Sequence, residues 1–160
     1  MCELIFFSSE HGSIVLILAE VLTEIGSYIQ TDQSFEEAGG LLIGERRGGH
    51  FIVNGISSPQ PTDVRRRSSF VRNVPGHYRI VQSAFRMSGG TSNYLGEWHT
   101  HPEDIPRPSS VDKESWVKNS LELKKHTLAL IQGRKGIYFS LILADGRVLE
   151  LKQVTDRHPK

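Results

Sequence analysis

The sequence predicts an α+β fold, in which a mixed, mostly antiparallel central sheet is flanked by helices in an arrangement close to three layers. Three observations predict it: segments with apolar residues at helical spacing, apolar runs typical of strands, and two glycine-bearing turns between consecutive strands. A chain of 160 residues has the usual size of one domain. We therefore expect a single domain over residues 1–155 and a short tail at residues 156–160.

The first part of the chain is predicted to contain a strand, a helix and a hairpin. Residues 2–7 are an apolar run that we interpret as a strand, and residues 13–29 have the pattern of an amphipathic helix. The apolar side chains of that helix, at spacings of three and four, are Ile14, Leu18, Val21, Leu22, Ile25 and Ile29. Residues 39–46 and 50–57 are predicted to pair as a β-hairpin around the turn Arg47-Gly48-Gly49.

The middle of the chain is predicted to begin with a loop that runs to about residue 68. A short strand at residues 69–73 follows, and residues 77–88 carry apolar side chains at helical spacing until the sequence SGGTSN ends the helix. Residues 94–101 then have the pattern of a strand.

A proline-rich loop at residues 102–108 leads from that strand into a predicted helix at residues 109–122. Three strands follow, the last two joined by the turn Asp145-Gly146. They cover residues 126–133, 136–146 and 147–154.

The overall charge excludes a general attraction to nucleic acid or to an anionic membrane. There are 19 Lys and Arg against 18 Asp and Glu, a formal charge of +1, and no stretch approaches the roughly 20 apolar residues of a membrane span. The N-terminus lacks the basic lead of a secretory signal, and a single cysteine, Cys2, rules out an internal disulfide. We therefore expect a cytoplasmic protein.

One local excess of positive charge is formed by Arg65, Arg66, Arg67 and Arg72. Such a run is commonly a solvated part of a loop, and the alternative is a rim that docks an acidic surface or a phosphate. The sequence leaves both interpretations open.

His99 and His101 are candidate metal ligands, because residues two apart on a strand point to the same face. Asp112 lies in the first turn of the following helix, and Pro106 and Pro108 stiffen the loop between them. Two imidazoles and one carboxylate leave the fourth tetrahedral position of a zinc ion for water, which is the pattern of a catalytic site.

Other roles explain some of these residues taken singly. Ser109 and Asp112 have the S-x-x-D spacing of a capping box, and histidines on one strand face are often structural. Helix capping explains neither His99 nor His101. Trp98 and Trp116, on either side of the ligands in the sequence, are predicted to serve packing.

Residues 99–112, read as H-x-H-P-x6-S-x-x-D, resemble the metal-binding motif of the JAMM metalloproteases, also called the JAB or MPN-plus family. The family also has an upstream glutamate that leads into a glycine-bounded apolar strand, and the sequence EAGGLLIG at residues 37–44 resembles that element. The resemblance covers most of the chain and implies a JAB/MPN domain over residues 1–155.

The resemblance implies a role for each residue of the motif. His99, His101 and Asp112 would hold a catalytic Zn²⁺ ion, and Glu37 would hydrogen-bond the water on it and act as general base. Ser109 would stabilise the oxyanion of the tetrahedral intermediate. The structural alternative for Glu37 is a solvated acid at a helix end.

The sequence GEWHTHPE followed by PRPSSVDKESW is most similar to those of the stand-alone bacterial JAB proteases of CBASS anti-phage operons. That resemblance implies an isopeptidase or peptidase, which cuts after the C-terminus of a ubiquitin-like modifier or a cGAS-like nucleotidyltransferase. Activating and conjugating enzymes would be encoded nearby. The substrate's extended tail is expected to add as a strand near the site, with residues 58–68 and 86–93 framing the groove.

Two other classes of function stay open. RadC-type proteins resemble the same motif and are associated with nucleic acid, but the near-neutral charge argues against a DNA-binding surface. A metal-stabilised interaction scaffold is the third class.

Overall fold

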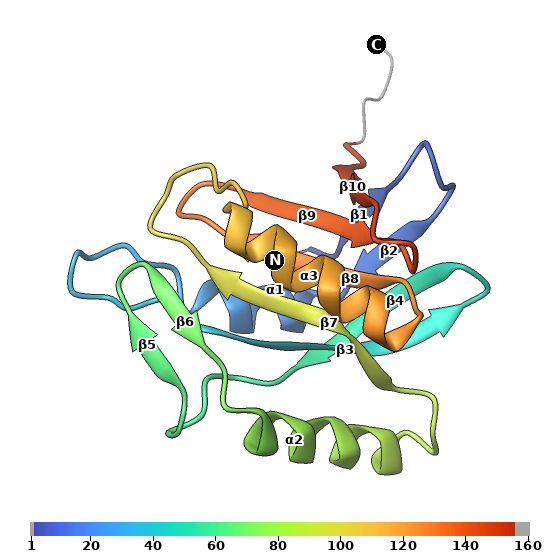
Figure 1. Cartoon of the computed structure of the whole chain (residues 1–160), viewed down its shortest axis with the longest axis horizontal. Helices are drawn as coiled ribbons and strands as arrows, with labels where there is room; N and C mark the ends of the chain where they lie inside the picture. The colour runs from blue at the N-terminus through green and yellow to red at the C-terminus, as the bar shows by residue number, and fades with distance from the viewer. Residues whose placement is uncertain (1, 156–160) are drawn as a thin grey trace.

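A computed structural model describes residues 2–155, which form a strongly curved sheet with helices on both faces (Figure 1). In chain order the elements are β1 (Leu4–Phe7), β2 (Ile14–Ile17), α1 (Ala19–Gly26), β3 (Gly39–Arg47), β4 (His50–Ile56), β5 (Val64–Arg66), β6 (Ser69–Val71), α2 (Val74–Met87), β7 (Asn93–Thr100), α3 (Ser110–Leu123), β8 (Thr127–Gln132), β9 (Ile137–Ile142), β10 (Val148–Glu150) and β11 (Lys152–Gln153). No helix among the described residues has the length and apolar character that a membrane crossing requires. The predicted tail at residues 156–160 lies outside the described part.

The main sheet has the strand order β10-β9-β8-β7-β3-β4-β2-β1-β11. Strands β2 and β4 pair in parallel, as do β7 and β8, and the other neighbours pair antiparallel. The predicted α+β fold with a mixed, mostly antiparallel sheet is therefore confirmed.

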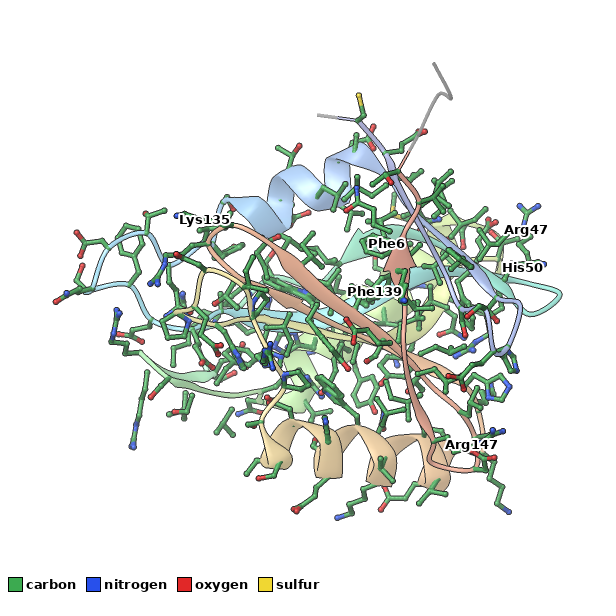
Figure 2. The ribbon with its side chains drawn as sticks, turned by 90° about the horizontal axis from the view of Figure 1, so that it is seen from above. Phe6, Arg47, His50, Lys135, Phe139 and Arg147 are labelled. Atoms are coloured by element: carbon green, nitrogen blue, oxygen red, sulfur yellow. The ribbon has the colours of Figure 1, made fainter. Side chains whose placement is uncertain are left out.

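The sheet is closed into a rolled shape by its last two strands, which follow one another almost directly in the sequence. Strands β10 and β11 are separated by Leu151 alone, yet β10 pairs with β9 and β11 pairs with β1. The two ends of the sheet therefore meet, and the rings of Phe6 and Phe139 pack edge to face with centroids 5.0 Å apart (Figure 2). The single strand predicted at residues 147–154 is thus two short strands that serve opposite ends of the sheet.

The helices cover opposite faces of the sheet. Leu128 and Leu130 of β8 belong to the large apolar core that includes Leu22 and Ile25 of α1, whereas the alternate residues of β8 pack against Trp116 of α3. Because side chains alternate along a strand, α1 and α3 lie on opposite faces. Helix α2 packs through Val81 against Leu41 and Ile43 of β3, on the same face as α3.

The helix predicted at residues 13–29 is wrong in its first half. Residues Ile14–Ile17 form β2, which pairs antiparallel with β1 and parallel with β4, and the helix is only Ala19–Gly26. A continuous apolar run fits both the helical and the strand pattern, and hydrogen-bonding partners on both sides favour the strand. The loop predicted up to residue 68 also contains β5, which pairs with β6 as a separate hairpin.

A buried polar network fastens the loop between β4 and β5 to helix α2. The Ser57 hydroxyl lies 2.6 Å from His77 Nδ1, and Asp63 Oδ2 lies 2.8 Å from His77 Nε2. The side chains of Asp63 and His77 are fully buried, and the Asp63 carboxylate also accepts hydrogen bonds from the backbone N–H groups of Gln60 and Asn73. Serine, histidine and aspartate can act together in catalysis. The side chains of Ser57, His77 and Asp63 are buried, however, so we assign them a structural role.

We expect Asp63→Ala to lower the free energy of unfolding by about 3 kcal/mol, because His77 and two backbone donors lose a buried charged acceptor. Urea denaturation measures the loss. Glu10→Ala, at an exposed position, is the control and should change stability by less than about 0.5 kcal/mol. A loss at Asp63 no larger than that of the control would contradict the structural role.

Candidate metal centre

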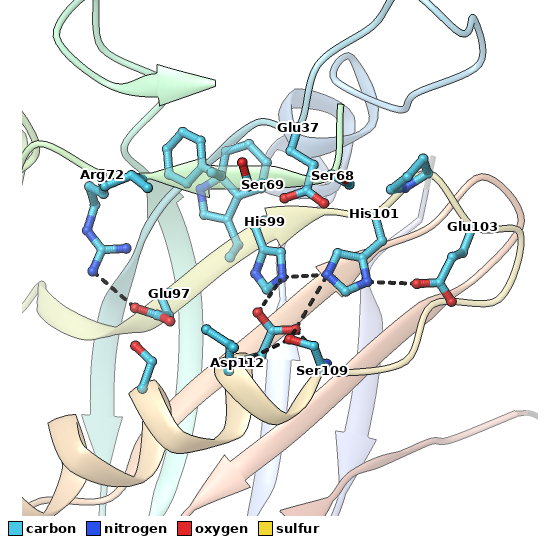
Figure 3. Close-up of a pocket in the computed structure, with 16 residues that line it drawn as sticks. Glu37, Ser68, Ser69, Arg72, Glu97, His99, His101, Glu103, Ser109 and Asp112 are labelled. Atoms are coloured by element: carbon cyan, nitrogen blue, oxygen red, sulfur yellow. Dashed lines mark hydrogen bonds and ion pairs between the residues drawn. The ribbon is translucent and has the colours of Figure 1, made fainter. Parts of the chain in front are cut away.

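A groove of about 660 Å³ lies over β7. Its floor carries Glu97, His99 and His101, one wall is formed by β6, and the other by the start of α3 (Figure 3). Glu37 closes the groove beside the two histidines. All five candidate site residues of the sequence analysis line this one groove.

The two histidines converge because His99, in β7, and His101, directly after its end, alternate with core residues. Trp98 and Thr100 are buried on the opposite face, so His99 and His101 both face the groove. Their Nε2 atoms lie 2.9 Å apart, and both side chains are largely buried. Trp98 and Trp116 are buried packing residues, as predicted.

Asp112 completes a set of three ligand atoms. Its Oδ1 lies 3.4 Å from His99 Nε2, and its Oδ2 lies 3.5 Å from His101 Nε2. Ligands at about 2.0–2.1 Å in tetrahedral geometry around zinc lie about 3.3 Å from one another. The three side chains therefore fit a single metal ion in both donor type and spacing.

Helix capping and metal ligation use the same arrangement of Ser109 and Asp112. The Ser109 backbone N–H and hydroxyl both donate to Asp112 Oδ2, at 2.7 Å and 2.8 Å, and the Ser109 hydroxyl accepts from the Asp112 N–H. This is a complete capping box at the start of α3. It turns the carboxylate towards His99 and His101, so the two interpretations of the S-x-x-D pattern are compatible.

The Asp112 carboxylate is held in its charged form. Burial alone would raise the pKa of Asp112, but hydrogen bonds from His101 and His99 and from the Ser109 backbone bring this pKa well below its usual range. A carboxylate that stays ionised is the form in which aspartate binds a metal.

Glu103 orients one of the two candidate histidine ligands. Its Oε1 lies 3.0 Å from His101 Nδ1, which favours a proton on Nδ1, so that Nε2 could bind a metal ion once the proton that it donates to Asp112 is displaced. This role of Glu103 was not predicted from the sequence, where the available signal is a carboxylate two residues after a candidate histidine ligand.

Glu37 reaches the groove through the pairing of β3 with β7. Gly39 is paired with His99, and the Thr100 N–H donates to the Ala38 carbonyl at 2.8 Å, so Glu37 follows opposite His101. Its side chain is buried, and burial is the main cause that raises the pKa of Glu37 to about 7. A carboxyl group with this pKa accepts and releases protons near neutral pH, which is what a general base requires.

The expectation that residues 58–68 and 86–93 frame the groove is only partly met. Ser68 lines it together with Ser69–Arg72, and Arg72 forms an ion pair of 3.0 Å with Glu97 inside the groove. None of residues 86–93 lines it. These residues enter β7 at Asn93, the end of the strand away from His99, so they lie beside α2 instead.

The chain is similar to known proteins over most of its length. Residues 19–146 match the family model of prokaryotic homologs of the JAB domain. A protein of Escherichia coli named CD-NTase/cGAS isopeptidase is 42% identical over 97% of this chain and 99% of its own. A protein of Vibrio cholerae with the same name is 44% identical over 82% of this chain and 84% of its own.

A solved structure shares the fold. The solution structure of a Desulfitobacterium hafniense protein has a TM-score of 0.59 with this chain. It covers 86% of this chain and 88% of the other at 21% identity, so the likeness concerns the fold alone.

We expect His101→Ala to abolish stoichiometric zinc binding, because one of three ligand atoms is lost. Glu103→Gln should weaken binding by about 10- to 100-fold, since the ring nitrogen loses its charged partner. Zinc titration of the metal-stripped protein by calorimetry measures both, and His11→Ala, at an exposed position, is the control. Unchanged zinc affinity of His101→Ala would rule out this metal centre.

Proposed function

Because the chain belongs to the family of prokaryotic homologs of the JAB domain, we propose that it is a zinc-dependent isopeptidase that releases a protein joined to the C-terminus of a cGAS-like nucleotidyltransferase. The observation that carries the proposal is the convergence of three ligand atoms and one buried carboxyl group in a single groove. The names of the two similar proteins, CD-NTase/cGAS isopeptidase, support the choice of substrate. A ubiquitin-like modifier is the broader substrate class that the same groove would accept.

In this proposal, His99, His101 and Asp112 hold one Zn²⁺ ion through two nitrogens and one carboxylate oxygen. The bound ion would supply Lewis acidity, which acidifies water and polarises the carbonyl of the scissile bond. Glu37 accepts a proton from the attacking water and returns it to the leaving amine. Its carboxyl group is buried in the same groove, beside the two histidines.

Ser109 is proposed to donate its hydroxyl to the oxyanion that develops on the substrate carbonyl. The hydroxyl lies at the groove and donates to Asp112 Oδ2 at 2.8 Å. The Ser109 backbone N–H donates to the same oxygen at 2.7 Å, so Asp112 keeps a hydrogen bond when the hydroxyl rotates towards substrate.

The groove suits an extended peptide tail. Strand β6 pairs with β5 along one edge, while Ser69, Phe70 and Val71 line the groove. A tail lying along β6 would gain main-chain hydrogen bonds and would pass over His99. Its carbonyl groups would then lie within reach of the metal centre.

The proposed setting is the cytoplasm, where the exposed thiol of Cys2 stays reduced. Activating and conjugating enzymes are expected to be encoded beside the gene. Cell fractionation and sequencing of the flanking genes test these two points.

A nucleic-acid-associated role has less support. The formal charge is +1, and three of the four arginines in the local excess bind groups of the chain itself: Arg65 and Arg67 donate to backbone carbonyls, and Arg72 pairs with Glu97. A scaffold role would not require a buried carboxyl group beside the three ligand atoms.

We expect Glu37→Gln to reduce cleavage by about 10²- to 10⁴-fold without loss of zinc, because the amide cannot accept the proton. The substrate is a cGAS-like nucleotidyltransferase joined through its C-terminus to a lysine of a reporter protein, and cleavage is followed by electrophoresis. Glu36→Gln, on the exposed neighbouring residue, is the matched control. A free C-terminal tail peptide should compete with the conjugate.

Two results would contradict these assignments. If the zinc-loaded wild type leaves the conjugate and a ubiquitin-like conjugate intact, the proposed function fails. If Glu37→Gln cleaves as fast as the wild type, Glu37 is not the general base.

Ser109→Gly removes the hydroxyl but costs the helix only a few tenths of a kcal/mol, since glycine is tolerated at the N-cap. At saturating zinc we expect the cleavage rate of this variant to fall by about 10²- to 10³-fold. Ser109→Thr, which keeps a hydroxyl, should retain most of the rate. A wild-type rate for zinc-saturated Ser109→Gly would remove Ser109 from the mechanism.

A further inference from the structure

The arginine run of the sequence folds back onto the segment that carries Glu37. Arg65 Nε donates to the Glu37 carbonyl at 2.9 Å, and an Nη of Arg65 donates to the Glu36 carbonyl at 3.4 Å. On the same side, the Glu37 N–H donates to the Arg66 carbonyl at 2.7 Å. Both backbone polar groups of Glu37 are therefore bonded to β5.

The segment at residues 27–38 needs such support because it contains neither helix nor strand. Its earlier part is held by Arg67, whose Nη1 donates to the Gln33 carbonyl at 2.7 Å. The buried amide of Gln30 donates to the carbonyls of Phe35 and Arg67, at 3.1 Å and 2.8 Å. The segment that carries Glu37 thus rests on β5 and on the turn that follows it.

The same hairpin touches the groove through its other strand. Phe70 of β6 packs against Gly39, where a Cβ atom would lie only 2.8 Å from the phenyl ring. Ser68, Ser69 and Arg72 line the groove opposite Asp112 (Figure 3). One strand of the hairpin therefore faces the proposed substrate and the other holds Glu37.

Arginine suits this contact better than lysine. The planar guanidinium presents several N–H groups in a fixed fork, so that it can bond two successive carbonyls at once, whereas an ammonium group is a single point of charge. Arg65 is half-buried. Its guanidinium N–H groups supply hydrogen bonds to the carbonyls of an irregular segment that lacks those of a helix or strand.

We propose that Arg65 is a positioning residue, which holds the backbone of Glu37 so that its carboxyl group faces the metal centre and ties this group to the substrate-facing hairpin. The inference rests on the proposed role of Glu37 as general base. It assigns Arg65 to the support of the site, in place of a role in a solvated loop or in a rim that docks an acidic partner.

Arg65→Gln tests the inference in the full-length, zinc-loaded protein with the conjugate as substrate. We expect kcat to fall by about 10- to 100-fold, because a small displacement of a catalytic group has this effect. KM and zinc content should stay within about twofold of the wild type. Arg65→Lys should recover part of kcat, and Arg79→Gln, an equal charge change at an exposed position of α2, should leave kcat unchanged.

The double variant Arg65→Gln with Glu37→Gln separates positioning from general loss of structure. If Arg65 acts only through Glu37, the double variant cleaves no more slowly than Glu37→Gln alone. A further loss in the double variant, or a wild-type kcat for Arg65→Gln beside an impaired Glu37→Gln, overturns the inference and leaves the proposed function intact. A wild-type rate for Glu37→Gln instead overturns the assignment of the base on which the inference rests.

Discussion

The site depends on the antiparallel pairing of β3 with β7. Gly39 is paired with His99, and the Thr100 hydroxyl accepts a hydrogen bond of 2.9 Å from the Ala38 N–H. The residues just before β3 therefore run alongside the end of β7. This pairing brings Glu37 to two histidines that follow it by more than sixty residues in the sequence. A slip of one residue would turn both histidines to the opposite face.

The third candidate ligand, Asp112, is positioned by a different kind of constraint. The proline-containing loop returns the chain from the end of β7 to the start of α3, and the capping box of Ser109 and Asp112 sets the first turn of that helix. Capping is a local interaction that forms with the helix itself. The pairing of β3 with β7 and the capping box of α3 thus position the candidate ligands independently of each other, and both are ordinary elements of a fold.

Local patterns were sufficient to predict much of the site and the fold class. Alternation on one strand predicts that His99 and His101 face the same way, and the S-x-x-D spacing predicts the cap. The strand at Ile14–Ile17 was missed because its pairing with β4 depends on residues far along the chain. The contacts of Arg65 and Gln30 were not predicted for the same reason, since they reach backbone carbonyls 28 and 37 residues away and leave no periodic pattern. The ligand set is a prediction with which the geometry agrees.

The way the sheet closes determines when the sheet can be completed during synthesis of the chain. Phe6 is paired with Gln153, so a strand synthesised before every residue of the proposed site pairs with one synthesised after them all. Every residue of the proposed site has been synthesised long before that, between Glu37 and Asp112. A nascent chain therefore carries all the candidate ligands while its sheet is still open, and the rolled sheet is completed only after Lys152 and Gln153 have left the ribosome.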